Sequence, residues 1–116
     1  MTGTVFDSQR LMESVADDAE LASELLQAYL EDAPQRMSAL RQGLEQESLD
    51  QVVRSAHSLK GMSGVIRAPG LVERALNMEM KARAEDRDGV AAALPGLGDC
   101  LEQVLGEIRT FLDTLA

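Results

Sequence analysis

Residues 49–66 read LDQVVRSAHSLKGMSGVI, and their apolar side chains recur at the spacing of an α-helix. At about 100° per residue, these apolar side chains fall on one side of the helix and most of the polar ones fall on the other. The apolar set is Leu49, Val52, Val53, Ala56, Leu59 and Ile66. The pattern predicts an amphipathic helix that packs its apolar side against other helices.

His57, the one histidine of the chain, lies outside the apolar side of this helix. It shares the opposite flank with Asp50, Arg54, Gly61 and Gly64. An interior glycine costs a helix about 1 kcal/mol relative to alanine, so two glycines beside the histidine require a reason. Close approach of a partner to the imidazole supplies one, because bare backbone leaves room on the turns that follow the histidine.

The composition of the 116-residue chain favours helices, since only three aromatic residues stand among many Leu, Ala, Val and Met. Strands favour aromatic and β-branched residues, so we expect an all-α fold, and the length fits one domain with one core. The single cysteine, Cys100, excludes an internal disulfide and is expected as a reduced thiol on the apolar side of the last helix. No secretory segment opens the chain and no apolar run approaches the ~20 residues of a membrane span. We therefore expect a cytoplasmic protein that does not bind membranes.

Start and stop signals divide the chain into five predicted helices. The first is short, begins at Asp7 or Ser8 and extends to about residue 15. The second begins at Asp17-Asp18 and carries apolar residues as far as Leu44; Pro34 inside it predicts a kink near residues 30–34 rather than a break. The others are predicted from the cap Ser48 to about Ile66, from about Pro69 to Ala84, and over about residues 88–115 with Pro95 inside, after a charged loop at residues 85–88.

The net charge of −9 is unevenly distributed along the chain. Residues 1–53 carry 11 acidic and 3 basic side chains, residues 54–87 carry 4 acidic and 7 basic, and residues 88–116 carry 5 acidic and 1 basic. The histidine helix and the next one thus form a basic zone on an acidic chain, which suits a site for an anionic group. A solvated face of mixed charge is the alternative. The acidic body as a whole predicts that the chain does not bind nucleic acid.

The sequence around His57 resembles the signature of histidine-containing phosphotransfer (HPt) domains, approximately Ala-His-x-Leu-Lys-Gly followed by small residues. The matching segment is Ala56-His57-Ser58-Leu59-Lys60-Gly61, followed by Ser63 and Gly64. The resemblance covers essentially the whole chain and implies a single domain over residues 1–116, folded as an up-and-down four-helix bundle with a short additional N-terminal helix. Its flanking matches are Val5-Phe6-Asp7, Tyr29-Leu30-Glu31-Asp32-Ala33-Pro34, Leu71, Met78-Glu79 and Arg83.

The resemblance implies a phosphorelay carrier. His57 would accept a phosphoryl group, on Nε2, from the aspartyl phosphate of a receiver domain and pass it to another receiver, since an uncharged imidazole nitrogen is a nucleophile near neutral pH. Lys60 matches the family lysine close to the phosphoryl oxygens, and Gly61 matches the glycine that leaves room for the receiver. The implied partners are response-regulator receiver domains and a hybrid sensor kinase. Mg²⁺ belongs to the receiver, so this chain itself is expected to need no cofactor.

Further residues near the histidine are candidates for partner contact. Gly64 lies on the same flank as the histidine, Val65 is predicted to be an exposed apolar contact, and Arg54 can meet an acidic partner. Ser63 falls on the apolar side and is interpreted as structural. Its hydroxyl is expected to bond back to the carbonyl of Leu59.

Glu79 and Arg83, on the following predicted helix, fall where HPt proteins often carry polar residues near the histidine. Arg83 would add positive charge beside the phosphate and Glu79 would orient a side chain; an exposed i, i+4 ion pair is an open alternative. Arg67 departs from the family pattern, because most members have a glycine there that ends the helix. It predicts a different helix ending, through Pro69-Gly70, and adds a cation for partner contact.

Two other roles stay open beside the free carrier. The chain could be the phosphoacceptor domain of a larger hybrid or chemotaxis-type sensor kinase, although a start at Met1 and an end directly after the last helix favour a free-standing carrier. We expect this carrier to be a monomer. It could also be a non-catalytic interaction bundle, against which the joint presence of His57, Lys60 and Gly61 argues. Because no nucleotide-binding loop is present, we expect a phosphotransfer intermediate without autonomous kinase activity. One histidine and a distant cysteine predict no metal site.

Overall fold

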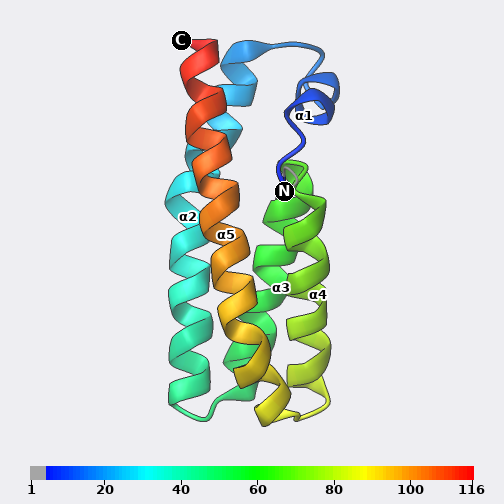
Figure 1. Ribbon diagram of the computed structural model, residues 1–116, viewed down its shortest axis with the longest axis vertical. Helices are drawn as coiled ribbons and strands as arrows, with labels where there is room; N and C mark the ends of the chain where they lie inside the picture. Colours follow the sequence, from blue (N-terminus) through cyan, green and yellow to red (C-terminus); the bar gives the residue numbers. More distant parts are fainter. Residues whose placement is uncertain (1–4) are drawn as a thin grey trace.

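The computed structural model describes residues 5–116, which fold into helices without any strand. Helices α2 to α5 run alternately up and down, and the short α1 lies near the end of the bundle where α3 ends and α4 begins (Figure 1). The predicted all-α, up-and-down four-helix bundle with a short additional N-terminal helix is confirmed for the described residues. The helices are α1 (Ser8–Ser14), α2 (Ala19–Glu45), α3 (Leu49–Val65), α4 (Pro69–Arg83) and α5 (Arg87–Leu115).

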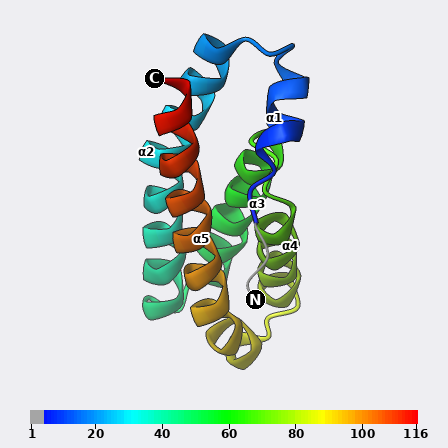
Figure 2. The same ribbon diagram turned by 45° about the horizontal axis from the view of Figure 1, so that its top comes forward.

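The four long helices enclose one core. Helix α2 packs against α3 and α5, and α4 packs against the same two helices, so the four form a closed arrangement (Figure 2). The predicted apolar side of the histidine helix faces inward, and Cys100 is buried on α5 as a free thiol, as expected. Each helix contributes fully buried side chains, among them Leu11, Leu26, Leu40, Leu59, Leu71 and Ile108.

Side chains cap four of the helices at their N-termini. The carboxylates of Asp7, Asp18 and Asp86 and the hydroxyl of Ser48 each accept a hydrogen bond from a backbone N–H of the first turn. These bonds satisfy N–H groups that have no partner within the helix. Helix α4 has no such cap and begins instead with Pro69, whose missing N–H costs nothing at this position. The predicted starts of these helices follow from these residues.

Two details of the helix boundaries concern α5 and the internal prolines. Helix α5 begins inside the segment predicted as a charged loop, residues 85–88, because Asp86 caps it and Arg87 is already helical. Both long helices continue through a proline, Pro34 in α2 and Pro95 in α5. The expectation that Pro34 does not break its helix is confirmed, and the kink at this proline stays a prediction.

The end of α3 differs from the prediction. Arg67 itself adopts the left-handed conformation, with φ 67°, that glycine usually takes after a helix. Its N–H donates to the carbonyl of Gly64 at 3.2 Å, and the N–H of Ala68 donates to the carbonyl of Ser63 at 2.9 Å. These are the two hydrogen bonds of a Schellman ending. The predicted ending through Pro69-Gly70 is therefore wrong, because the backbone bonds formed at Arg67 outweigh the cost of its conformation.

Replacing Arg67 by Gly is expected to raise the free energy of unfolding by about 1 kcal/mol. A residue with a Cβ loses about 1–2 kcal/mol in the left-handed region, whereas glycine adopts this region freely. The carbonyl of residue 67 accepts the N–H of Asp7 at 2.8 Å, and glycine keeps this bond. Urea unfolding measures the difference, with Arg67→Ala as the control that retains a Cβ. A glycine variant no more stable than the alanine variant would contradict the predicted strain.

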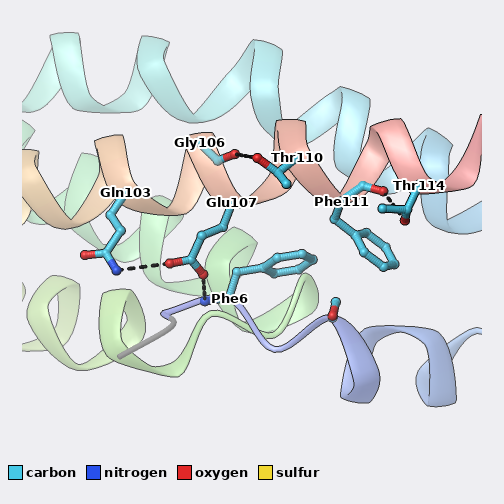
Figure 3. Close-up of a pocket in the computed structure, with 8 residues that line it drawn as sticks. Phe6, Gln103, Gly106, Glu107, Thr110, Phe111 and Thr114 are labelled. Carbon is cyan, nitrogen blue, oxygen red and sulfur yellow. Dashed lines mark hydrogen bonds between the residues drawn. The ribbon is translucent and has the colours of Figure 1, made fainter. Parts of the chain in front are cut away.

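Residues 5 and 6, which precede α1, are bound to α5. The carboxylate of Glu107 accepts the N–H groups of Val5 and Phe6 at 3.0 and 2.9 Å. Phe6 packs edge to face on Phe111, with the ring centroids 5.8 Å apart. Figure 3 shows Phe6, Glu107 and Phe111 at the lining of a pocket between the segment and α5. The volume of this pocket is about 620 Å³. The contacts hold the start of the described chain against the last helix.

Candidate functional site

His57 projects from the surface of α3. Its side chain is 64% exposed, whereas Ala56 and Leu59 on the same helix are fully buried. The position predicted for the imidazole, outside the apolar side of the helix, is therefore confirmed. The ring is accessible to a reactant that approaches from solvent.

A single buried carboxylate lies beside this imidazole. Glu79, on α4, has 7% of its side chain exposed. Its Oε2 lies 3.2 Å from Nδ1 of His57 and 2.8 Å from Nη2 of Arg83, and its Oε1 lies 2.8 Å from Nζ of Lys60. The packing of α3 on α4 thus brings four predicted site residues into one group, called here the Glu79 cluster: His57, Lys60, Glu79 and Arg83.

The charge of Glu79 is fixed by its partners. The hydrogen bond from Lys60 is the largest cause that lowers the pKa of Glu79, and burial opposes it; together with the bonds from Arg83 and His57, the net effect lowers this pKa to about 2. The carboxyl group is therefore ionised near neutral pH. The i, i+4 pair of Glu79 with Arg83 does form, but its carboxylate is buried, so it is not the exposed ion pair that was the open alternative.

The carboxylate also determines which nitrogen of His57 carries the proton in the neutral ring. An ionised carboxylate has no proton to donate, so the bond of 3.2 Å requires Nδ1 to be the donor. Nε2 then holds the lone pair. A hydrogen bond to one ring nitrogen fixes the tautomer in this way at many histidine sites. The arrangement gives His57 a defined nucleophilic atom, Nε2.

Bare backbone lies on the turns after the histidine. A Cβ built at Gly61 would meet nothing within 4 Å, and one at Gly64 would meet only Cγ2 of Val72 at 3.9 Å. Val65 is 56% exposed, as predicted. Gly61 therefore serves no close packing inside the bundle, and the surface beyond His57 is open at this point.

The two remaining predicted cations lie outside the Glu79 cluster. Arg54, one turn before His57, is exposed and pairs with Asp50 at 2.9 Å. Arg67 is exposed at the end of α3, where its backbone carbonyl binds the N–H of Asp7. Arg54 thus precedes His57 within α3, and Arg67 follows the end of this helix.

Ser63 is buried, as its place in the pattern predicts, but the partner of its hydroxyl is not the one expected. Its Oγ lies 2.8 Å from the hydroxyl of Tyr29 on α2, instead of bonding back to the carbonyl of Leu59. Burial raises the pKa of the Tyr29 hydroxyl. The bond joins α2 to α3 inside the core, so Ser63 ties the histidine helix to its neighbour.

Two exposed apolar side chains of α4 are absent from the predicted contact surface. Leu76 and Met80 lie on α4 on either side of Glu79 in sequence, and Met80 is 60% exposed. Single exposed apolar residues are common on protein surfaces, so their presence in the sequence carried no signal. The sequence alone does not show that both side chains are exposed on the helix that carries Glu79, and this exposure is what makes them candidates for partner contact.

Comparison with known proteins places this arrangement in a family. The family model of the Hpt domain matches residues 24–110, which include α3, α4 and the whole Glu79 cluster. The chain belongs to the Hpt domain family. Among solved structures, a histidine-containing phosphotransfer protein from maize, ZmHP2, matches with a TM-score of 0.80 and 22% sequence identity. The match covers 97% of this chain and 85% of the maize chain, and it supports the fold assigned here.

No curated protein sequence matches the chain significantly. Within residues 5–116, no group of three or more His, Cys, Asp and Glu side chains could hold a metal ion. In the same part of the chain, no helix has both the length and the apolar character needed to cross a membrane.

Proposed function

We propose that residues 1–116 form a single Hpt domain that carries phosphoryl groups between receiver domains. His57 accepts the group from a receiver aspartyl phosphate and passes it to the aspartate of another receiver. The observation that carries this proposal is the bond of His57 Nδ1 to the buried Glu79 on a ring that is 64% exposed. It provides a nucleophile with a fixed tautomer on an accessible surface.

The transfer step follows from this geometry. The lone pair of Nε2 attacks phosphorus and forms the N–P bond, while the P–O bond breaks and its electron pair leaves on the carboxylate of the receiver aspartate. The proton on Nδ1 stays, so the ring becomes positively charged. The ionised Glu79 at 3.2 Å stabilises this charge as it develops. Glu79 is thus a positioning residue that also favours attack electrostatically.

The domain supplies little else to the reaction. Phosphoryl transfer requires in-line positioning and neutralisation of charge more than covalent assistance. We infer that the receiver holds the Mg²⁺ ion, while Lys60 and Arg83 place positive charge beside His57. In the reverse direction the same groups return the phosphoryl group to an aspartate, so the domain acts as an intermediate without kinase activity of its own.

The proposed docking surface surrounds the histidine. Gly61 and Gly64 allow the loops of a receiver to approach, and Val65 gives an apolar contact. Leu76 and Met80, which are exposed on α4, are further candidates for apolar contact with the partner. Apolar anchors at the centre with charges at the rim are the usual composition of a protein interface. Two further cations, Arg54 on α3 and Arg67 directly after its end, steer an acidic partner.

Transfer from phosphorylated receivers tests the proposal. The protein is mixed with each member of a panel of radiolabelled receiver domains from its source organism, and separately with ATP alone. We expect at least one receiver to give the protein an acid-labile, base-stable label, as a phosphoramidate requires, and ATP alone to give none. The fastest donor identifies the partner. Absence of label from every receiver would contradict the proposed function.

A further inference from the structure

The two cations closest to His57 are already engaged before any phosphoryl group arrives. Nζ of Lys60 lies 2.8 Å from Oε1 of Glu79, and Arg83 places Nε and Nη2 at 3.1 and 2.8 Å from Oε2. Each oxygen of the carboxylate therefore has a cationic partner. Lys60 and Arg83 are directed at the carboxylate, although a phosphoryl group on Nε2 of His57 would be a stronger anion.

A phosphoryl group on His57 must compete for these cations. Lys60 follows His57 by one turn of α3, so its flexible side chain can reach either anion. If it leaves, Glu79 loses its partner while it stays buried, and an unpaired buried charge is strongly unfavourable. A phosphoryl group at the surface retains water as an alternative partner. The competition therefore favours the carboxylate.

We propose that Glu79 determines how tightly the phosphoryl group is held, by keeping Lys60 and Arg83 away from it. The inference rests on the proposed function, because it concerns the phosphorylated state of His57. With both cations retained by Glu79, the phosphohistidine gains little electrostatic stabilisation. The group then stays easy to transfer to the next aspartate, which is what a carrier requires.

The proposal predicts that the effect of Lys60 on the stability of the phosphohistidine depends on the residue at position 79. With Glu79 present, removal of the Lys60 charge changes the stability of the phosphohistidine little. With a neutral residue at position 79, the released Lys60 binds the phosphoryl oxygens directly and stabilises the phosphorylated state. A lysine that simply binds the phosphoryl group would matter equally in both cases.

The test is a double-mutant cycle on the transfer equilibrium. The fastest receiver from the panel and the full-length protein are brought to equilibrium, and the ratio of phosphorylated protein to phosphorylated receiver is measured for wild type, Glu79→Gln, Lys60→Met/Arg83→Met and the triple variant. The amide oxygen of glutamine can still accept the hydrogen bond from Nδ1–H of His57. We expect Glu79→Gln to raise the ratio about tenfold, the factor expected of one charge-assisted hydrogen bond. When both cations are absent, the same substitution should lower the ratio, because only the stabilisation of the charged ring by Glu79 is then lost.

Several outcomes would overturn the inference. One is an unchanged or lower ratio for Glu79→Gln, and another is a shift of equal size with and without the two cations, because Glu79 would then act on the imidazole alone. Circular dichroism shows whether Glu79→Gln folds into helices. If it does not, Lys60→Met in the protein that retains Glu79 decides the question. A fall of about tenfold in the ratio for this variant would also overturn the inference. If His57 takes the label normally and one of these results is found, only this inference is rejected. If the wild-type protein takes no label, the proposed function is rejected together with this inference.

Discussion

Replacing His57 by Gln is expected to abolish phosphorylation while the bundle stays folded. The amide has no nucleophilic nitrogen comparable to imidazole Nε2, so no N–P bond can form. The side chain at this position is 64% exposed, and substitutions at exposed positions usually change stability by no more than about 0.5 kcal/mol. Label transfer from the fastest receiver measures the first effect, and thermal unfolding followed by circular dichroism measures the second.

Arg54→Gln is the matched control for this experiment. It places the same side chain on an exposed position of α3 one turn earlier, outside the Glu79 cluster. The control protein should take the label with at most a few-fold loss of rate, since a charge at the rim contributes mainly to association. Detectable phosphoramidate on the His57→Gln protein would show that another residue accepts the group, and the site assignment would fail.

The sequence predicts the fold well because its start signals are local. Asp7, Asp18 and Ser48 each stand directly before an apolar periodic segment, and each caps a helix in the structure. The end of α3 was predicted wrongly because its conformation depends on bonds that no single residue type announces. Arginine does not favour a positive φ, yet Arg67 adopts one because the two hydrogen bonds of the Schellman ending require it.

The site was predictable in part for similar reasons. His57, Lys60 and the glycines follow from the motif and the helical spacing. The burial of Glu79 does not, because an i, i+4 pair with Arg83 has the same sequence pattern on a solvated face and in a packed one. The packing of α4 on α3 decides between them. The Tyr29–Ser63 bond was equally hidden, because it joins residues 34 positions apart in the chain.

The second large effect is expected from the glycine after the histidine. Gly61→Gln should slow transfer from a phosphorylated receiver about a hundredfold, because a side chain on the approach path displaces the partner, and misplacement by about 1 Å can cost this much. Lys60→Ala should slow it only a few-fold, since Glu79 already engages the Lys60 ammonium. Raised salt should reduce mainly the association rate of the wild-type protein, because charges more than about 8–10 Å apart are screened.

Gly106→Gln provides the control for a helix glycine with open space. A Cβ at Gly106 on α5 also meets nothing within 4 Å, so both substitutions replace an unobstructed helical glycine by the same residue. Both should raise the free energy of unfolding by up to about 1 kcal/mol, but Gly106→Gln should transfer at the wild-type rate. Single-turnover transfer at two ionic strengths separates chemistry from association. If Gly61→Gln also transfers at the wild-type rate, the partner does not approach over the glycine face, and the docking surface must lie elsewhere around His57.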